Sequence, residues 1–189
     1  VEVDASGGRE LAVVRLLDNG AADPSFSGDG RLLVNPLGGA ARYEEKCSIV
    51  VRASGAIAVA WTTDDLTTIG ILQLTSTGSL DPGFGSGGVL SIAVPGETKL
   101  TDLALWFPSG SEQLVATGYL STASTEGLDA LLLTTGNGVT YSSGFLDNPE
   151  PGTSERGVGL ATQSDGALIL GMTASGSGFS RGSLVRLTA

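Results

Sequence analysis

Short apolar runs alternate along the whole chain with clusters of Gly, Ser, Thr, Asp and Pro. Runs of roughly four to eight apolar residues between turn residues are typical of β-strands, and no useful apolar stripe at helical spacing interrupts them. We therefore expect an all-β protein with many tight turns. The predicted strands cover residues 11–17, 31–35, 46–52, 56–63, 69–75, 89–94, 100–107, 113–120, 130–134, 157–163 and 167–173.

The strand pattern repeats with a period of about 57 residues, which is typical of an array of supersecondary units. Residues 23–26 and 81–84 share the form Asp-Pro-x-Phe, and Gly55, Gly110 and Gly166 mark three similar hairpins. The run LAVVRLL from residue 11 returns as IGILQLT, DALLLTT and SLVRLTA. We divide this single repeat domain into units at residues 11–66, 67–126 and 127–182, followed by a final strand at 183–188.

The Asp-Pro-x-Phe element predicts a turn that anchors two strands. Proline fixes φ near about −65°, the Asp carboxylate can accept backbone N–H bonds, and the Phe can turn into the core. The functional alternative is a metal site made of Asp23, Asp29 and Asp81, but calcium needs several oxygen ligands close together. Because Gly87 replaces Asp29 in the second copy, the spacing disfavours a metal site.

These motifs resemble the delta-60 repeats of large bacterial surface and secreted proteins, and the resemblance covers nearly the whole chain. It implies β-propeller blades, with about three four-stranded repeats, and it implies no established activity and no catalytic, cofactor or metal residues. Periodicity alone leaves a β-trefoil as the alternative fold. The matching residues are Arg15, Leu16, Gly20, Asp23, Phe26, Gly28 and Gly30 in the first copy; Leu74, Gly78, Ser79, Leu80, Asp81, Phe84, Gly85, Gly87 and Gly88 in the second; and Gln163, Asp165, Gly166, Leu168, Leu170 and Gly171 in the third.

The third unit departs from the pattern at residues 141–155, where the Asp-Pro-x-Phe turn is replaced by a segment rich in Pro and Gly. We expect a long loop or a remodelled blade edge there, without a clear strand.

The two ends of the sequence match strands of a complete unit. Residues 184–187 align with 13–16, and on the same offset residues 1–3 align with 172–174. Propellers usually close with roughly four to eight blades, so three blades would close only under strain. We expect both terminal strands to be paired, residues 1–3 near 167–173 if the units close on themselves. We also expect a second copy or a companion chain with more repeats to cover the open edges.

Charge and composition limit the classes of binding partner that we expect. The chain has 189 residues, 29 of them glycine, and a net charge of −10, which repels nucleic acid and anionic membranes. No apolar run is long enough to span a membrane, and no signal peptide is visible, so we expect the leader of a secreted protein to be removed. A glycan or a surface protein remains as a partner. Cys47 falls in the apolar run CSIVV, which predicts a small buried thiol.

The chain lacks histidine, which excludes Ser-His-Asp triads, Cys-His pairs and His-based zinc sites. Paired carboxylates remain open as a catalytic route, although the residues 164–166 lack the spacing of a sialidase Asp box. The acidic pairs at 44–45 and 64–65 are expected to be solvated. Trp61 and Trp106 lie in apolar strands, which favours packing between blades over a sugar-binding platform.

Two main functions follow. The leading one is a non-catalytic β-propeller segment, without a cofactor, that acts as a binding or structural module of a secreted or cell-surface bacterial protein. The alternative is a carbohydrate-active propeller, a hydrolase or lyase, with paired carboxylates in a central pocket or on residues 141–155. A fragment without independent function is a third hypothesis.

Overall fold

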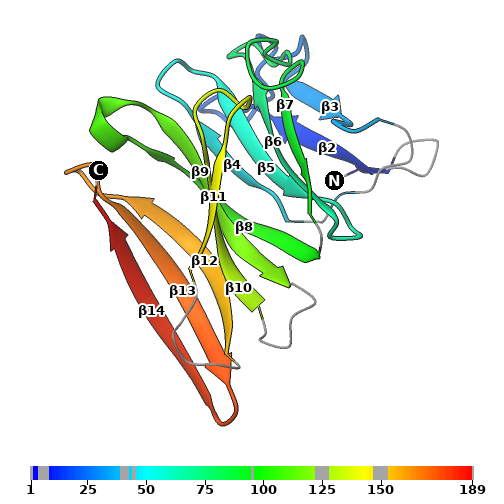
Figure 1. Ribbon diagram of the computed structural model, residues 1–189. Coiled ribbons are helices and arrows are strands. Elements are labelled where there is room, and N and C mark those ends of the chain that lie inside the picture. Colours follow the sequence, from blue (N-terminus) through cyan, green and yellow to red (C-terminus); the bar gives the residue numbers. More distant parts are fainter. Residues whose placement is uncertain are drawn as a thin grey trace.

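The computed structural model describes residues 2–3, 9–38, 43, 46–94, 96–121, 128–146 and 153–188. In this part of the chain the strands form four antiparallel sheets (Figure 1). One short 3-10 turn, η1 (Pro108–Gly110), interrupts the strands. No helix in the described ranges has the length and apolarity needed to cross a membrane.

Strand order follows the chain within each sheet. The first sheet contains β1 (Glu2–Val3), β2 (Arg9–Val14) and β3 (Arg31–Val34). The second contains β4 (Ser48–Val51), β5 (Ile57–Thr62), β6 (Thr68–Leu74) and β7 (Val89–Ala93). The third contains β8 (Glu97–Trp106), β9 (Gln113–Ser121), β10 (Leu128–Thr135) and β11 (Ser142–Leu146). The fourth contains β12 (Ser154–Thr162), β13 (Leu168–Gly176) and β14 (Phe179–Leu187).

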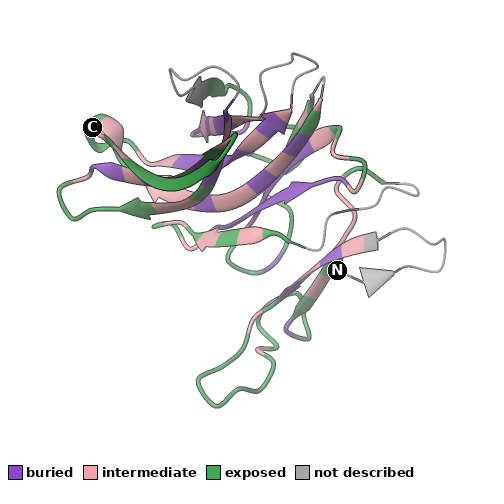
Figure 2. Ribbon diagram, turned by 90° about the horizontal axis from the view of Figure 1, so that it is seen from below, coloured by how far each residue is buried: buried purple, intermediate pink, exposed green. Residues whose placement is uncertain are grey.

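Successive sheets pack on one another in chain order, which is the arrangement of blades in a β-propeller. Because side chains alternate between the two faces of a strand, each inner sheet can bury both faces. Three apolar clusters result, one between each pair of neighbouring sheets, and buried residues concentrate there (Figure 2). The first and last sheets lie at opposite sides of the molecule, and the described sheets do not close into a ring (Figure 1).

The all-β fold with propeller-type sheets is confirmed, and every predicted strand overlaps an observed one. The sequence units, however, are out of phase with the sheets. Units 67–126 and 127–182 start with the third strand of a four-stranded sheet, β6 or β10, and unit 11–66 starts with β2 of the three-stranded first sheet. Each unit ends in the next sheet, so four sheets appear where about three units were expected. A periodic pattern fixes the length of the repeat but leaves its starting point free, whereas hydrogen bonding between strands defines the sheet.

Three local predictions need correction. Residues 142–146 of the 141–155 segment form the regular outer strand β11, which pairs with β10, while residues 147–152 lie outside the described residues. Val3 pairs with Arg9 in β2 and not near residues 167–173. Cys47 is exposed, because it precedes β4 instead of lying inside it. The expected pairing of the final strand is confirmed, since β14 pairs with β13.

Candidate functional site

The two Asp-Pro-x-Phe turns form as the sequence predicts. Asp23 Oδ1 accepts the backbone N–H of Ser25 at 2.9 Å, and Asp81 Oδ1 accepts that of Gly83 at 2.9 Å. The second carboxylate oxygen accepts a side-chain donor from the preceding strand: Arg15 Nε for Asp23 and Gln73 Nε2 for Asp81, both at 2.8 Å. Both carboxylates therefore hold the local turn.

These bonds also set the acidity of the two carboxyls. The hydrogen bonds from the hydroxyl and the backbone of Ser25, followed by the charge of Arg15, lower the pKa of Asp23 below its ordinary value. The pKa of Asp81 is lowered chiefly by the Gln73 amide and then by the Gly83 N–H. A lowered pKa is typical of a carboxylate that accepts several hydrogen bonds, and it favours a structural anion over a general acid.

Each Asp-Pro-x-Phe turn also contacts the next sheet. Phe26 and Phe84 are fully buried. The residue after each Phe donates its backbone N–H to the following blade, Ser27 to Thr77 O and Gly85 to Asn137 O, both at 2.8 Å. A Cβ at Gly138 would lie 2.6 Å from Phe84 Cε1, so the contact requires glycine. The Asp-Pro-x-Phe element thus joins neighbouring blades.

A metal site at these turns is not supported. Asp29 Oδ1 accepts the backbone N–H of Arg31 at 2.9 Å, so Asp23, Asp29 and Asp81 each serve their own loop. Among the described residues, no group of three or more His, Cys, Asp or Glu side chains could hold a metal ion.

Asp102 links three blades, a role that the sequence pattern did not predict. Its Oδ1 accepts the Ser48 hydroxyl of β4 at 2.9 Å, and its Oδ2 accepts the Leu160 N–H of β12 at 2.8 Å. Asp102 lies at a register shift in β8, where Thr101 Oγ1 also donates to Gly157 O of β12 at 2.6 Å. The available signal was a charged residue in the middle of the predicted strand at 100–107, beside the apolar run of residues 103–107, and such a residue needs a specific partner if it is buried.

A second cross-blade group surrounds Arg52, which is mostly buried. Its Nε donates to Glu112 Oε1 at 2.6 Å, and its Nη1 donates to Gln73 Oε1 at 2.6 Å and to Gly136 O at 3.1 Å. Burial opposes the ionisation of Glu112, but hydrogen bonds from the Ala53 N–H and Arg52 outweigh it and lower the pKa of Glu112. These hydrogen bonds connect hairpins of adjacent blades. Arg52 and Glu112 therefore bind each other and neighbouring protein groups.

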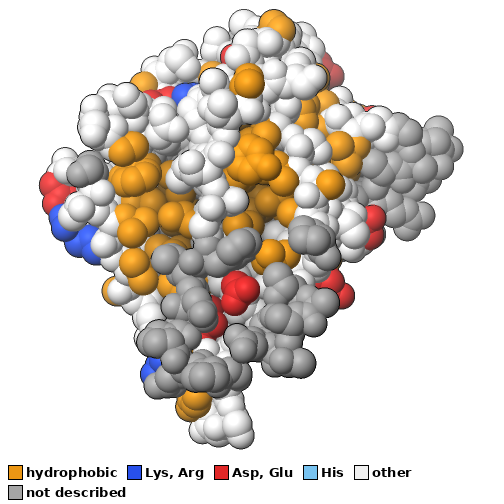
Figure 3. All heavy atoms as spheres, viewed as in Figure 1, with side chains coloured by type: hydrophobic (Ala, Val, Ile, Leu, Met, Phe, Trp, Pro, Cys, Tyr) orange, Lys and Arg blue, Asp and Glu red, His pale blue; other side chains and the backbone are white. Residues whose placement is uncertain are grey.

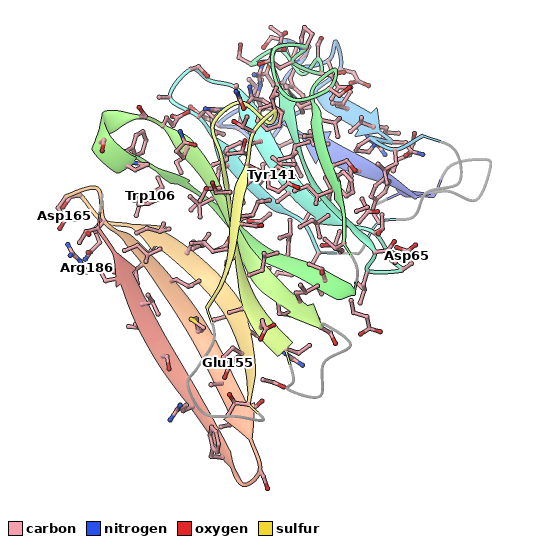
Figure 4. The ribbon with its side chains drawn as sticks, in the orientation of Figure 1. Asp65, Trp106, Tyr141, Glu155, Asp165 and Arg186 are labelled. Atoms are coloured by element: carbon pink, nitrogen blue, oxygen red, sulfur yellow. The ribbon has the colours of Figure 1, made fainter. Side chains whose placement is uncertain are left out.

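The remaining acidic residues lie apart. Asp65 lies in the β5–β6 turn of the second sheet, whereas Glu155 and Asp165 lie at well-separated places on the fourth sheet (Figure 4). Asp165 is ion-paired with Arg186 at 2.5 Å. The Asp65 carboxylate accepts the Thr63 and Thr67 hydroxyls, and these bonds lower its pKa. Glu155 is buried beside Thr153, and its Oε2 has no hydrogen-bond partner within the described ranges. Glu44 and Glu45 lie outside the described residues.

Both tryptophans contribute to packing between sheets. Trp61 is buried in the cluster between the first two sheets, and its ring meets that of Tyr43 edge-on at a centroid distance of 5.4 Å. Trp106 donates Nε1–H to Gly166 O in the β12–β13 hairpin at 3.0 Å (Figure 4). Neither ring is presented as a free platform.

Two open cavities lie near the turns, and neither has a carboxylate in its lining. One, of about 470 Å³, lies where the turn after Phe84 meets residues 138–139; the other, of about 270 Å³, lies beside Asn137 and Tyr141. Apolar side chains and polar groups share the lining of the first cavity, and polar groups dominate the second. Neither cavity supplies the acid pair that a glycosidase requires.

The outer faces of the first and last sheets expose apolar side chains. Elsewhere, hydrophobic side chains also gather over the middle of the surface seen in Figure 3. We define the first-sheet face by Val14, Leu16 and Leu33, and the last-sheet face by Val158, Ile169 and Leu184. On the first-sheet face Val14 is 54% and Leu16 58% exposed, whereas Leu72 and Leu74, the matching residues of β6, are 0% exposed.

The last-sheet face shows the same contrast. β6 pairs Ile71 with Ala60, and β14 pairs Leu184 with Gly171 at the equivalent position. Ile71 is buried against the third sheet, but Leu184 is 79% exposed. The first and last sheets thus display uncovered copies of the two faces that meet inside the chain.

One family matches part of the chain. Residues 2–26 match the family described as a domain of unknown function (DUF5122) beta-propeller. The match covers β1, β2 and the first Asp-Pro-x-Phe turn, so it agrees with the propeller-type sheets. No curated protein matches the chain.

Proposed function

We propose that the chain is a non-catalytic β-propeller segment that acts as a binding or structural module. The observation that carries this proposal is the pair of uncovered apolar faces, since Leu184 is 79% exposed where Ile71 is fully buried. Exposed apolar side chains at positions equivalent to buried contact residues favour a surface that packs against a partner. The module's role is to present blades to a partner.

The polar groups support the same role. Asp23, Asp81 and Asp102 hold turns and neighbouring blades, and the Arg52–Glu112 pair joins hairpins. A catalytic acid pair would need to face a shared concave site. The two cavities described above are lined by other groups.

The delta-60 resemblance and the composition suggest where such a module works. The repeats point to a secreted or cell-surface bacterial protein, and a net charge of −10 with only two lysines favours solubility without attraction to nucleic acid. A glycan or a surface protein is a further candidate partner beyond the repeats themselves.

Turnover assays test the non-catalytic role. The purified chain is incubated with a panel of polysaccharides and chromogenic glycosides, and new reducing ends and unsaturated products are measured. We expect no product above the blank. Product that increases with chain concentration, and that disappears in Glu155→Gln or Asp165→Asn, would contradict the proposal and support the carbohydrate-active alternative.

A further inference from the structure

We propose that the edge of β7 binds an extended peptide segment of a partner protein. The inference rests on the proposed function and names the class of partner that the module binds. It starts from the larger of the two cavities described above, of about 470 Å³, which is lined by residues 36–37, 85–86, 89–91 and 138–139. Ligand sites typically have volumes of about 300–1,000 Å³, so this cavity has the size of a binding site.

The cavity lies across the outer edge of the second sheet. β7 is the last strand of that sheet, and no further strand pairs with it in the described ranges. One wall, residues 36–37, follows β3 of the first sheet, and the opposite wall, residues 138–139, belongs to the β10–β11 turn of the third sheet. Because the first and third sheets pack on opposite faces of the second, the edge of β7 forms the floor between these walls (Figure 1).

The register of β7 identifies the backbone groups that this edge leaves open. Val94 N–H, just after β7, donates to Thr67 O at 2.8 Å, so Val94 bonds to the β6 side. The backbone groups of an antiparallel strand point alternately toward its partner and away from it. Ala93 and Ser91 therefore point their N–H and C=O groups away from β6. Ser91 is exposed and lies in the lining of the cavity.

These open groups select an extended polypeptide as the ligand. An added antiparallel strand can exchange two hydrogen bonds with Ser91, one donated by its N–H and one accepted by its C=O. None of the described residues that line the cavity is charged. A phosphate, carboxylate or ammonium group would therefore lose water there without gaining an ionic partner, whereas a peptide backbone supplies both of the uncharged groups that Ser91 needs.

Apolar side chains on both walls set the sequence preference of this site. Leu37 is 41% and Val139 is 66% exposed. Because side chains alternate between the two faces of a strand, consecutive residues of the added strand face the Leu37 wall and the Val139 wall in turn. We therefore expect two neighbouring apolar residues at the centre of the bound segment. The net charge of −10 disfavours acidic residues beside them.

Synthetic peptides test the proposal on the unmodified chain. The probes are capped, fluorescein-labelled hexapeptides with Thr in the flanks and with the two central residues varied among Val, Ile, Ser and Asp. Fluorescence anisotropy measures Kd at physiological ionic strength. Peptides with two apolar central residues should bind roughly tenfold more tightly, or better, than those with two Ser or two Asp residues.

Methylation of the peptide backbone tests the strand pairing itself. Only alternate N–H groups of an added strand face β7. N-methylation at every second residue should therefore weaken binding about tenfold or more in one of the two alternating sets of residues and have little effect in the other.

A matched pair of variants tests whether the peptide binds at β7. Ser91→Pro removes the outward N–H without removing a bond to β6, which an edge strand can tolerate, and it should weaken peptide binding about tenfold or more. Ser91→Ala keeps that N–H and should keep the Kd of the unmodified chain. Val139→Asp, which replaces an exposed apolar wall residue, takes the place of Ser91→Pro if circular dichroism shows that the proline variant does not fold.

Three results would overturn the proposal. The first is that no peptide of the panel binds the unmodified chain with a Kd below about 1 mM. The second is an equal effect of N-methylation in both sets of residues. The third is that Ser91→Pro, or Val139→Asp in its place, binds as tightly as Ser91→Ala. The turnover assay does not depend on these results, so the non-catalytic role stands or falls separately.

Discussion

The contact of Phe84 with the next blade gives the sharpest prediction for stability. Phe84 ends the second Asp-Pro-x-Phe turn, is only 1% exposed and belongs to the apolar cluster between the second and third sheets. Gly138 approaches its ring so closely that no Cβ fits between them. The Phe84→Ala variant would leave a cavity that this close-packed glycine turn cannot fill.

The expected loss follows from the buried volume. Replacing a fully buried Phe by Ala typically costs about 3–5 kcal/mol, from lost transfer free energy and the cavity left behind. Total stabilities are about 5–15 kcal/mol, so the change is a large fraction of the whole. For a chain of this size, about 2–4 °C per kcal/mol corresponds to a fall in Tm of roughly 6–20 °C.

Urea unfolding followed by circular dichroism measures the free energy of unfolding, and calorimetry measures Tm. Phe107→Ala is the matched control, because Phe107 is 37% exposed, and it should cost less than about 1.5 kcal/mol. Equal losses for the two variants would refute the assignment of Phe84 as an anchor between blades.

Three further predictions concern the same contacts. Gly138→Ala should destabilise the chain by clearly more than Gly87→Ala, because both glycines have positive φ but only Gly138 faces Phe84; equal falls in Tm would contradict this. Asp102→Ala should lower the free energy of unfolding by about 2–3 kcal/mol and speed amide hydrogen exchange in β12, and unchanged exchange would count against the link between blades. The pKa values of Asp23 and Asp81 are lowered in the folded state, so the stability that they contribute is present above about pH 4 and is lost as pH falls through the lowered values. NMR titration of the two carboxyls should show midpoints below the ordinary value of 3.8, and midpoints at 3.8 would contradict the hydrogen-bond assignment.

Local features were predictable where chemistry is confined to a few neighbouring residues. The turn at Asp23 follows from its own Asp, Pro and Phe, and the packing roles of Trp61 and Trp106 follow from their apolar strands. The strand β11 was missed because residues 142–146 show little alternation of apolar and polar side chains. The strand is held by backbone hydrogen bonds to β10, which the side-chain pattern does not reveal.

Contacts between distant segments were not predictable. Asp102 bonds to residues 54 and 58 positions away, and no local pattern contains those partners. The phase of the blades depends on which strands share hydrogen bonds, and periodicity does not fix it. The two open faces became visible only when matched strands, such as those with Ile71 and Leu184, could be compared for burial.

Incubation of the purified chain with the panel of polysaccharides and chromogenic glycosides tests the central claim most directly. The claim is that the chain is a non-catalytic β-propeller segment whose carboxylates hold turns and neighbouring blades. We predict no new reducing ends and no unsaturated products above the blank. Product that increases with chain concentration would contradict it.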